Sequence, residues 1–70
     1  MILILKESYP YFVMQDTSEI TQYCVMVRTP AGFSQQISPW YLRKGNAIRK
    51  YHAILKEKTN EILERRTVNV

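Results

Sequence analysis

The chain has 70 residues, of which 46% are hydrophobic, and a formal net charge of +4 at pH 7. Its length predicts a single small domain over residues 1–70, with a core that gives only marginal stability. The apolar share excludes a disordered chain, and the single Cys24 excludes an intramolecular disulfide framework. We therefore expect a cytoplasmic protein, and we leave open a homodimer that would enlarge its buried surface.

The first half of the chain predicts short antiparallel strands joined in a meander. The candidate strands are rich in β-forming residues, and they cover residues 2–5, 11–14, 22–28 and 33–37. In the third of these, alternation places Tyr23, Val25 and Val27 on one face of the strand, and Cys24, Met26 and Arg28 on the other. Pro10 predicts a turn after the first run, and Pro30 in "TPAG" is typical of a type I turn that closes a hairpin.

The apolar run at residues 2–5 is too short to be a targeting or membrane segment. No cation precedes it, and Lys6 and Glu7 follow it directly. A signal peptide has a longer apolar core, and a membrane span needs about 20 apolar residues. We therefore expect no membrane partner.

The second half of the chain predicts one long helix. Ser38 is favoured at the N-cap and Pro39 at the first helical position, so they predict a helical turn at 39–43. Gly inside a helix costs about 1 kcal/mol relative to Ala, so Gly45 predicts a break before a long helix over 47–66. The face expected to pack on the sheet consists of apolar residues at helical spacing: Ala47, Ile48, Tyr51, Ile54, Leu55 and Ile62.

Together these elements predict an α+β fold: a three- to four-stranded antiparallel meander packed against one long C-terminal helix, β-β-β-(β)-α. A helix of about 20 residues is roughly 30 Å long, so it should extend beyond such short strands. The order of elements resembles the arm-site DNA-binding domains of phage-type recombinases, without a shared sequence motif. That resemblance implies a sheet that lies in the major groove, although the strands here carry few Arg and Lys residues.

Residue patterns that would carry catalysis or bind a cofactor are mostly absent from the sequence. The only candidate nucleophile–base pair with a cysteine is Cys24 with His52, and one Cys with one His does not make a metal site. Asp16 and Glu19 share one loop, which is typical of a solvated segment. No glycine-rich phosphate loop is present. We therefore expect a non-enzymatic protein with no cofactor and no bound metal.

The positive charge is concentrated in the second half of the chain. Residues 1–37 carry two cations and three acids, whereas residues 38–70 carry eight cations and three acids. The start of the predicted helix gathers cations where the helix dipole favours acids, which indicates selection for an anionic ligand. The residues predicted to contact nucleic acid are Arg43, Lys44, Arg49, Lys50 and Lys56 through phosphates, with Trp40 and Tyr41 assisting by stacking.

Two functions fit these observations. The first is a small nucleic-acid-binding protein, with DNA favoured over RNA, and a positive surface that joins Arg28 to the helix would support it. The second is an accessory or inhibitor protein of phage or bacterial type that regulates a larger protein partner. For that function we expect an exposed aromatic surface on the sheet, formed by Tyr9, Tyr11 and Tyr23.

Overall fold

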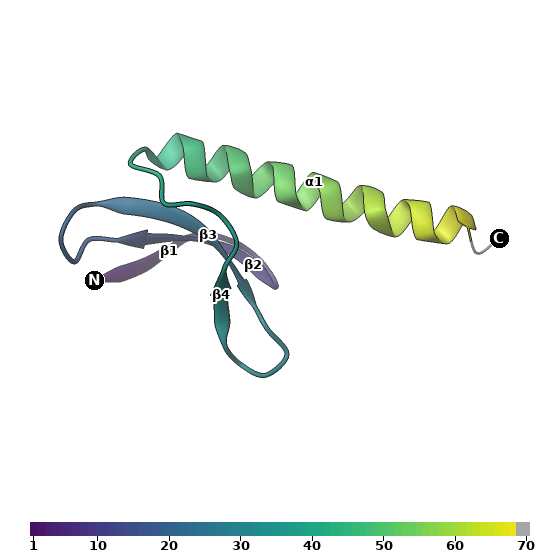
Figure 1. Cartoon of the computed structure of the whole chain (residues 1–70), viewed down its shortest axis with the longest axis horizontal. Helices are drawn as coiled ribbons and strands as arrows, with labels where there is room; N and C mark the ends of the chain where they lie inside the picture. The colour runs from purple at the N-terminus through teal and green to yellow at the C-terminus, as the bar shows by residue number, and fades with distance from the viewer. Residues whose placement is uncertain (69–70) are drawn as a thin grey trace.

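The computed structural model describes the backbone of residues 1–68 and the side chains of residues 1–59, and it has the predicted α+β architecture. A four-stranded antiparallel sheet forms one layer, and a single helix, α1 (Lys44–Val68), forms the other. Figure 1 shows that α1 crosses one face of the sheet and that its C-terminal part extends beyond the strands. The prediction that the helix is longer than the sheet is therefore confirmed.

The sheet is a meander in which neighbours in sequence are neighbours in space. Its strands are β1 (Ile2–Ser8), β2 (Tyr11–Asp16), β3 (Gln22–Arg28) and β4 (Ser34–Gln36), in the order β1-β2-β3-β4. The third strand agrees with its predicted bounds, whereas β1 is longer than the apolar run that predicted it. The outermost strands, β1 and β4, each pair along only one side.

The turns have the chemistry that their residues predict. A cis Tyr9–Pro10 peptide lies in the turn between β1 and β2. Between β3 and β4, the Gly32 N–H donates to the Thr29 carbonyl over 3.0 Å, and Gly32 has a φ of 91°. A type I turn followed by a left-handed glycine is a common hairpin connection, so the turn predicted at "TPAG" is confirmed.

The two faces of the sheet have different surroundings. Val13 and Val25 are fully buried beneath α1, where they pack with Ala47 and Tyr51. Side chains alternate along a strand, so Phe12, Cys24 and Met26 lie on the opposite face, which α1 does not cover. Phe12 is nevertheless buried, since the Arg28 guanidinium lies 4.6 Å from its ring centroid.

A β-bulge divides β1 into two parts. Residues 2–4 pair with 14–16 in one register, and residues 6–8 pair with 11–13 in a register shifted by one residue. Leu5 is the extra residue at this shift. The bulge places Lys6 beside Val13, on the side of the sheet that faces α1, while Ile4 pairs with Met14 on the other side.

The predicted helix start at Ser38 and Pro39 is wrong, and so is the predicted break at Gly45. The Ser38 hydroxyl accepts a hydrogen bond from the Val25 N–H over 2.8 Å, and Tyr41 forms two backbone hydrogen bonds with Tyr23. Ser38 therefore satisfies an N–H of β3 instead of capping a helix. The chain follows β3 as far as Tyr41, and α1 begins at Lys44 and passes through Gly45 without interruption.

The sheet-facing side of α1 largely agrees with the predicted apolar face. Ala47 and Tyr51 are buried, and Ile54 and Leu55 are half-buried against the core. The Tyr51 hydroxyl donates a 2.7 Å hydrogen bond to the Ser8 hydroxyl, which ties the helix to the end of β1. The predicted contribution of Ile62 lies outside the described side chains. Of the C-terminal residues 67–70, expected to be a tail or a short strand, the first two continue α1 and the others lie outside the described residues.

Candidate nucleic-acid interface

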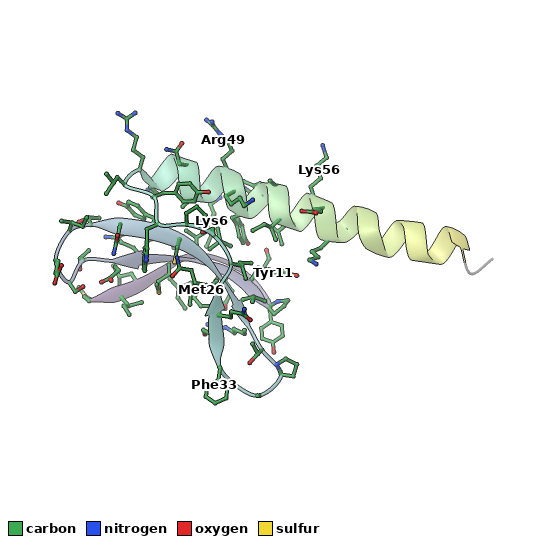
Figure 2. All side chains as sticks on the ribbon, in the orientation of Figure 1. Lys6, Tyr11, Met26, Phe33, Arg49 and Lys56 are labelled. Atoms are coloured by element: carbon green, nitrogen blue, oxygen red, sulfur yellow. The ribbon has the colours of Figure 1, made fainter. Side chains whose placement is uncertain are left out.

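Arg49 and Lys56 form the most outward part of the predicted site. They are seven residues apart on α1, which is close to two helical turns, so they lie on the same side. Figure 2 shows both side chains extending from the face of α1 that points away from the sheet. Both are exposed. The helix therefore presents two cations in a row with no part of the fold above them.

The remaining predicted cations lie at other positions around the start of α1. Arg43 and Lys44 are exposed at its N-terminal end. Lys50 lies on a flank of the helix, where it lines an open cleft of about 410 Å³ with Tyr11, Ile37 and other residues. The cations thus surround the first turns of α1 on several sides instead of forming one stripe.

Within the described side chains, these five cations have no acidic partner. The first turn of α1 contains no acid, and Glu57 is the only acidic residue among positions 44–59. The salt bridge seen among the described residues joins Arg28 to Glu7, over 2.9 Å, and does not involve the helix. The positive charge around the helix start is therefore not neutralised locally.

Arg28 does not extend the basic surface. It lies on the sheet face opposite α1, where it pairs with Glu7 and packs over Phe12. A continuous positive surface from Arg28 to the helix start, which would have supported nucleic-acid binding, is therefore not formed.

The predicted aromatic residues separate into core and surface. Tyr41 is half-buried and packs on the core, so it anchors the chain next to the helix start. Trp40 is 40% exposed and is the aromatic side chain near the cations that a ligand could reach. The expected exposed aromatic surface on the sheet is wrong for Tyr11 and Tyr23, since both pack towards α1, whereas Tyr9 is exposed in its turn.

Because α1 is not interrupted at Gly45, its start has fewer free backbone N–H groups than a helix break at Gly45 would have left. The Asn46 N–H donates to the Arg43 carbonyl over 3.2 Å, so this N–H group is not available to a ligand. The first N–H groups of α1 at Lys44 and Gly45 have no intrahelical acceptor, because every helix leaves its first N–H groups without one.

Lys6 is a cation that the sequence pattern did not place near this site. The bulge at Leu5 turns Lys6 to the side of the sheet that carries α1, and its side chain is exposed. Simple alternation from Leu3 would have placed Lys6 on the opposite face. No sequence signal marks the bulge.

The candidate catalytic and metal-binding residues do not come together. Cys24 is buried on the face of the sheet opposite α1, whereas His52 is exposed on α1 with its ring centroid 5.4 Å from that of Tyr51. Burial raises the pKa of the Cys24 thiol to about 11, with a smaller contribution from the Asp16 charge. No group of three potential metal ligands is found among the described residues.

Asp16 has a local structural role in the loop after β2. Its carboxylate accepts a 3.0 Å hydrogen bond from the Ser18 N–H. This backbone hydrogen bond, followed by one from the Ser18 side chain, holds the pKa of Asp16 below its usual value. The carboxylate is therefore stabilised by hydrogen bonds within its own loop.

None of the helical structure described for this chain is long and apolar enough to cross a membrane. No family model matches the sequence, and comparisons with curated proteins and with solved structures found no match. The resemblance to arm-site DNA-binding domains therefore stays a prediction based on the order of elements.

Proposed function

We propose that this is a small cytoplasmic protein without catalytic activity that binds nucleic acid, with DNA favoured over RNA, through the cations around the start of α1. The observation that carries the proposal is that Arg43, Lys44, Arg49, Lys50 and Lys56 are exposed and that none has an acidic partner among the described residues. Cations at a helix N-terminus oppose the helix dipole. A bound phosphate backbone would neutralise them and would release counterions from the nucleic acid.

The contact would be made by the outward side of α1 and not by the sheet. Arg49 and Lys56 point away from the fold (Figure 2), so a phosphate backbone could reach both without displacing any other element. Trp40, four residues before Lys44 in the sequence, could add stacking on an unpaired base. Stacking of this kind contributes about 1–3 kcal/mol per base.

A charge-matched pair of variants tests this proposal. We expect fluorescence anisotropy with labelled random duplex and single-stranded DNA and RNA to show binding at about 50 mM salt and weakening by 200 mM. The double variant R49Q/K56Q should bind more weakly, and its log–log salt slope on duplex DNA should fall by about 0.9 per lost contact. The control R65Q/R66Q removes the same charge at the other end of the chain and should have a smaller effect.

Two results would contradict the proposal. One is the absence of binding at low salt with micromolar protein. The other is an equal loss of affinity in R49Q/K56Q and R65Q/R66Q, because the binding would then depend on net charge and not on the helix start.

A second candidate function, regulation of a larger protein, is favoured by two exposed aromatic side chains. Tyr9 and Phe33 are 77% and 73% exposed in turns at the same end of the antiparallel sheet. Aromatic side chains are enriched at protein–protein contacts. If this function holds, the double variant Y9A/F33A should lose a partner that both the wild type and R49Q/K56Q retain in affinity capture. Loss of that partner in R49Q/K56Q alone would contradict it.

A further inference from the structure

The N-terminal part of β1 presents consecutive apolar side chains to solvent. Met1, Ile2, Leu3 and Ile4 are 74%, 63%, 43% and 48% exposed. Exposed runs of three or four apolar residues are rare unless they are functional. The helix does not cover this strand, since α1 packs over β2 and β3 and reaches β1 at Ser8 through Tyr51. A strand with this composition at the edge of a sheet is suited to pairing with another strand.

The hydrogen-bonding groups of this edge follow from one bond at its start. The Thr17 N–H donates to the Met1 carbonyl over 3.0 Å, so Met1 points its carbonyl towards β2. Antiparallel ladders alternate, so Leu3 also pairs with β2, while the N–H and C=O groups of Ile2 and Ile4 point outwards. After the bulge the alternation is broken, and Glu7 is the next residue whose groups point to the free edge.

We propose that two copies of this chain pair through these edges, antiparallel, about a two-fold axis at Leu3. In this register Ile2 of one copy lies opposite Ile4 of the other, and the outward N–H and C=O groups of both residues find partners. Leu3 lies opposite Leu3 of the second copy. Shifting the axis to Ile4 would place Ile2 opposite Lys6, whose backbone groups point towards β2. The register at Leu3 therefore pairs all the outward groups of both apolar segments.

The side chains of β1 favour a second copy of this chain, and not an unrelated strand, as the partner of this edge. Paired residues of antiparallel strands lie on the same face, so Ile2 and Ile4 of both copies would form one apolar cluster, next to Met14. Lys6 and Glu7 lie beyond the paired segment, so no charged side chain would be buried. The gain in apolar burial is also what this chain lacks, because its fully or nearly buried apolar side chains among the described residues are few: Phe12, Val13, Cys24, Val25, Ala47 and Tyr51.

A pair of matched substitutions tests whether the apolar part of β1 forms the dimer contact. Sedimentation equilibrium of the wild type should give about 17 kDa, twice the 8.3 kDa of one chain. I2K should halve this mass, because its ammonium group would face an apolar partner. I20K makes the same change at a residue that is 57% exposed in the loop after β2, and it should stay dimeric. Circular dichroism checks that both variants fold.

Disulfide crosslinking tests the register. In a C24A background, L3C should oxidise readily to a covalent dimer, because directly opposed residues of a non-hydrogen-bonded pair are about 4.5 Å apart at Cα, which suits a disulfide. I2C should crosslink more slowly, since its symmetry mate is a diagonal neighbour, and I20C should crosslink only at the rate of random collision.

The pairing would be overturned if the wild type stayed monomeric at several hundred micromolar. It would also be overturned if the I2K variant formed as much dimer as the I20K variant. Equal crosslinking of L3C and I20C would overturn the two-fold axis at Leu3. The comparison of R49Q/K56Q with R65Q/R66Q does not require a dimer, so a failure of the pairing and a failure of the proposed DNA binding can be told apart.

Discussion

The fold buries the Cys24 thiol, so the reactivity of this thiol should differ between the folded and the unfolded chain. At pH 8 the native thiol should be protonated, because burial raises its pKa to about 11, and only the thiolate reacts. We expect its reaction with a thiol reagent to be slower in the native protein than in urea by a factor of at least about 10. Equal rates in the two states would show that Cys24 is accessible.

The same pKa predicts how stability changes with pH. The unfolded chain, with a thiol pKa of 9.0, loses the Cys24 proton before the folded chain does. The free energy of unfolding should therefore fall as pH rises from 9 towards 11, by at most about 1.4 kcal/mol per pH unit from this group. Urea titrations of the wild type and C24A, compared at pH 8 and pH 10.5, isolate the effect. A pH dependence unchanged in C24A would assign it to other groups.

The Tyr51 hydroxyl should contribute to stability through its bond to Ser8. Y51F keeps the buried ring and removes the 2.7 Å hydrogen bond, so it should lower the free energy of unfolding by about 0.5–1.5 kcal/mol. Y9F removes a hydroxyl from a side chain that is 77% exposed and should change the stability little. A double-mutant cycle with S8A would show whether the loss belongs to this pair.

At the level of single elements, α1 contains a glycine that can be replaced with benefit. A Cβ added at Gly45 or at Gly32 would meet no atom within 4 Å, but only Gly32 has a positive φ, of 91°. G45A should therefore stabilise the protein by about 0.5–1 kcal/mol, because Ala favours a helix. G32A should destabilise it, because the left-handed conformation strains an Ala residue. Thermal unfolding of both variants measures the contrast, and a loss of stability in G45A would show that the helix does not pass through this residue.

Much of the fold follows from local patterns, and the differences have identifiable causes. The alternation in β3 and the turn at Pro30 predict the observed strand and hairpin, because both depend on neighbouring residues. The helix start was mispredicted because Ser38 bonds to Val25, thirteen residues away in sequence. No local pattern records such a partner.

Only part of the candidate site could be predicted from local sequence patterns. The exposure of Arg49 and Lys56 follows from helical spacing relative to Ala47 and Tyr51. The positions of Lys6 and Arg28 could not be predicted, since one depends on the bulge at Leu5 and the other on a salt bridge between β1 and β3. Burial of Tyr11 and Tyr23 likewise depends on which face of the sheet α1 covers.

At the scale of the whole molecule, the helix and the proposed pairing edge are compatible. A two-fold axis perpendicular to the sheet at Leu3 keeps the faces covered by α1 on the same side in both copies. The outward cations of the two helices would then belong to one composite surface. If both proposals hold, I2K should weaken DNA binding while I20K does not, because the monomer would lose the second contact. Equal affinity of the two variants would show that each copy binds alone.

The two edges of the sheet are chemically unlike, and this difference would limit the proposed assembly to two chains. In the proposed dimer, the apolar edge at β1 would be covered by the second copy. The opposite edge has only the short polar strand β4. It is followed by Pro39, which has no N–H to donate. Each copy therefore has one edge that is suited to pairing, and a symmetric dimer leaves neither of these two edges exposed. The pairing ends at two chains, so an exposed strand that could nucleate fibres in another protein would here form a closed dimer.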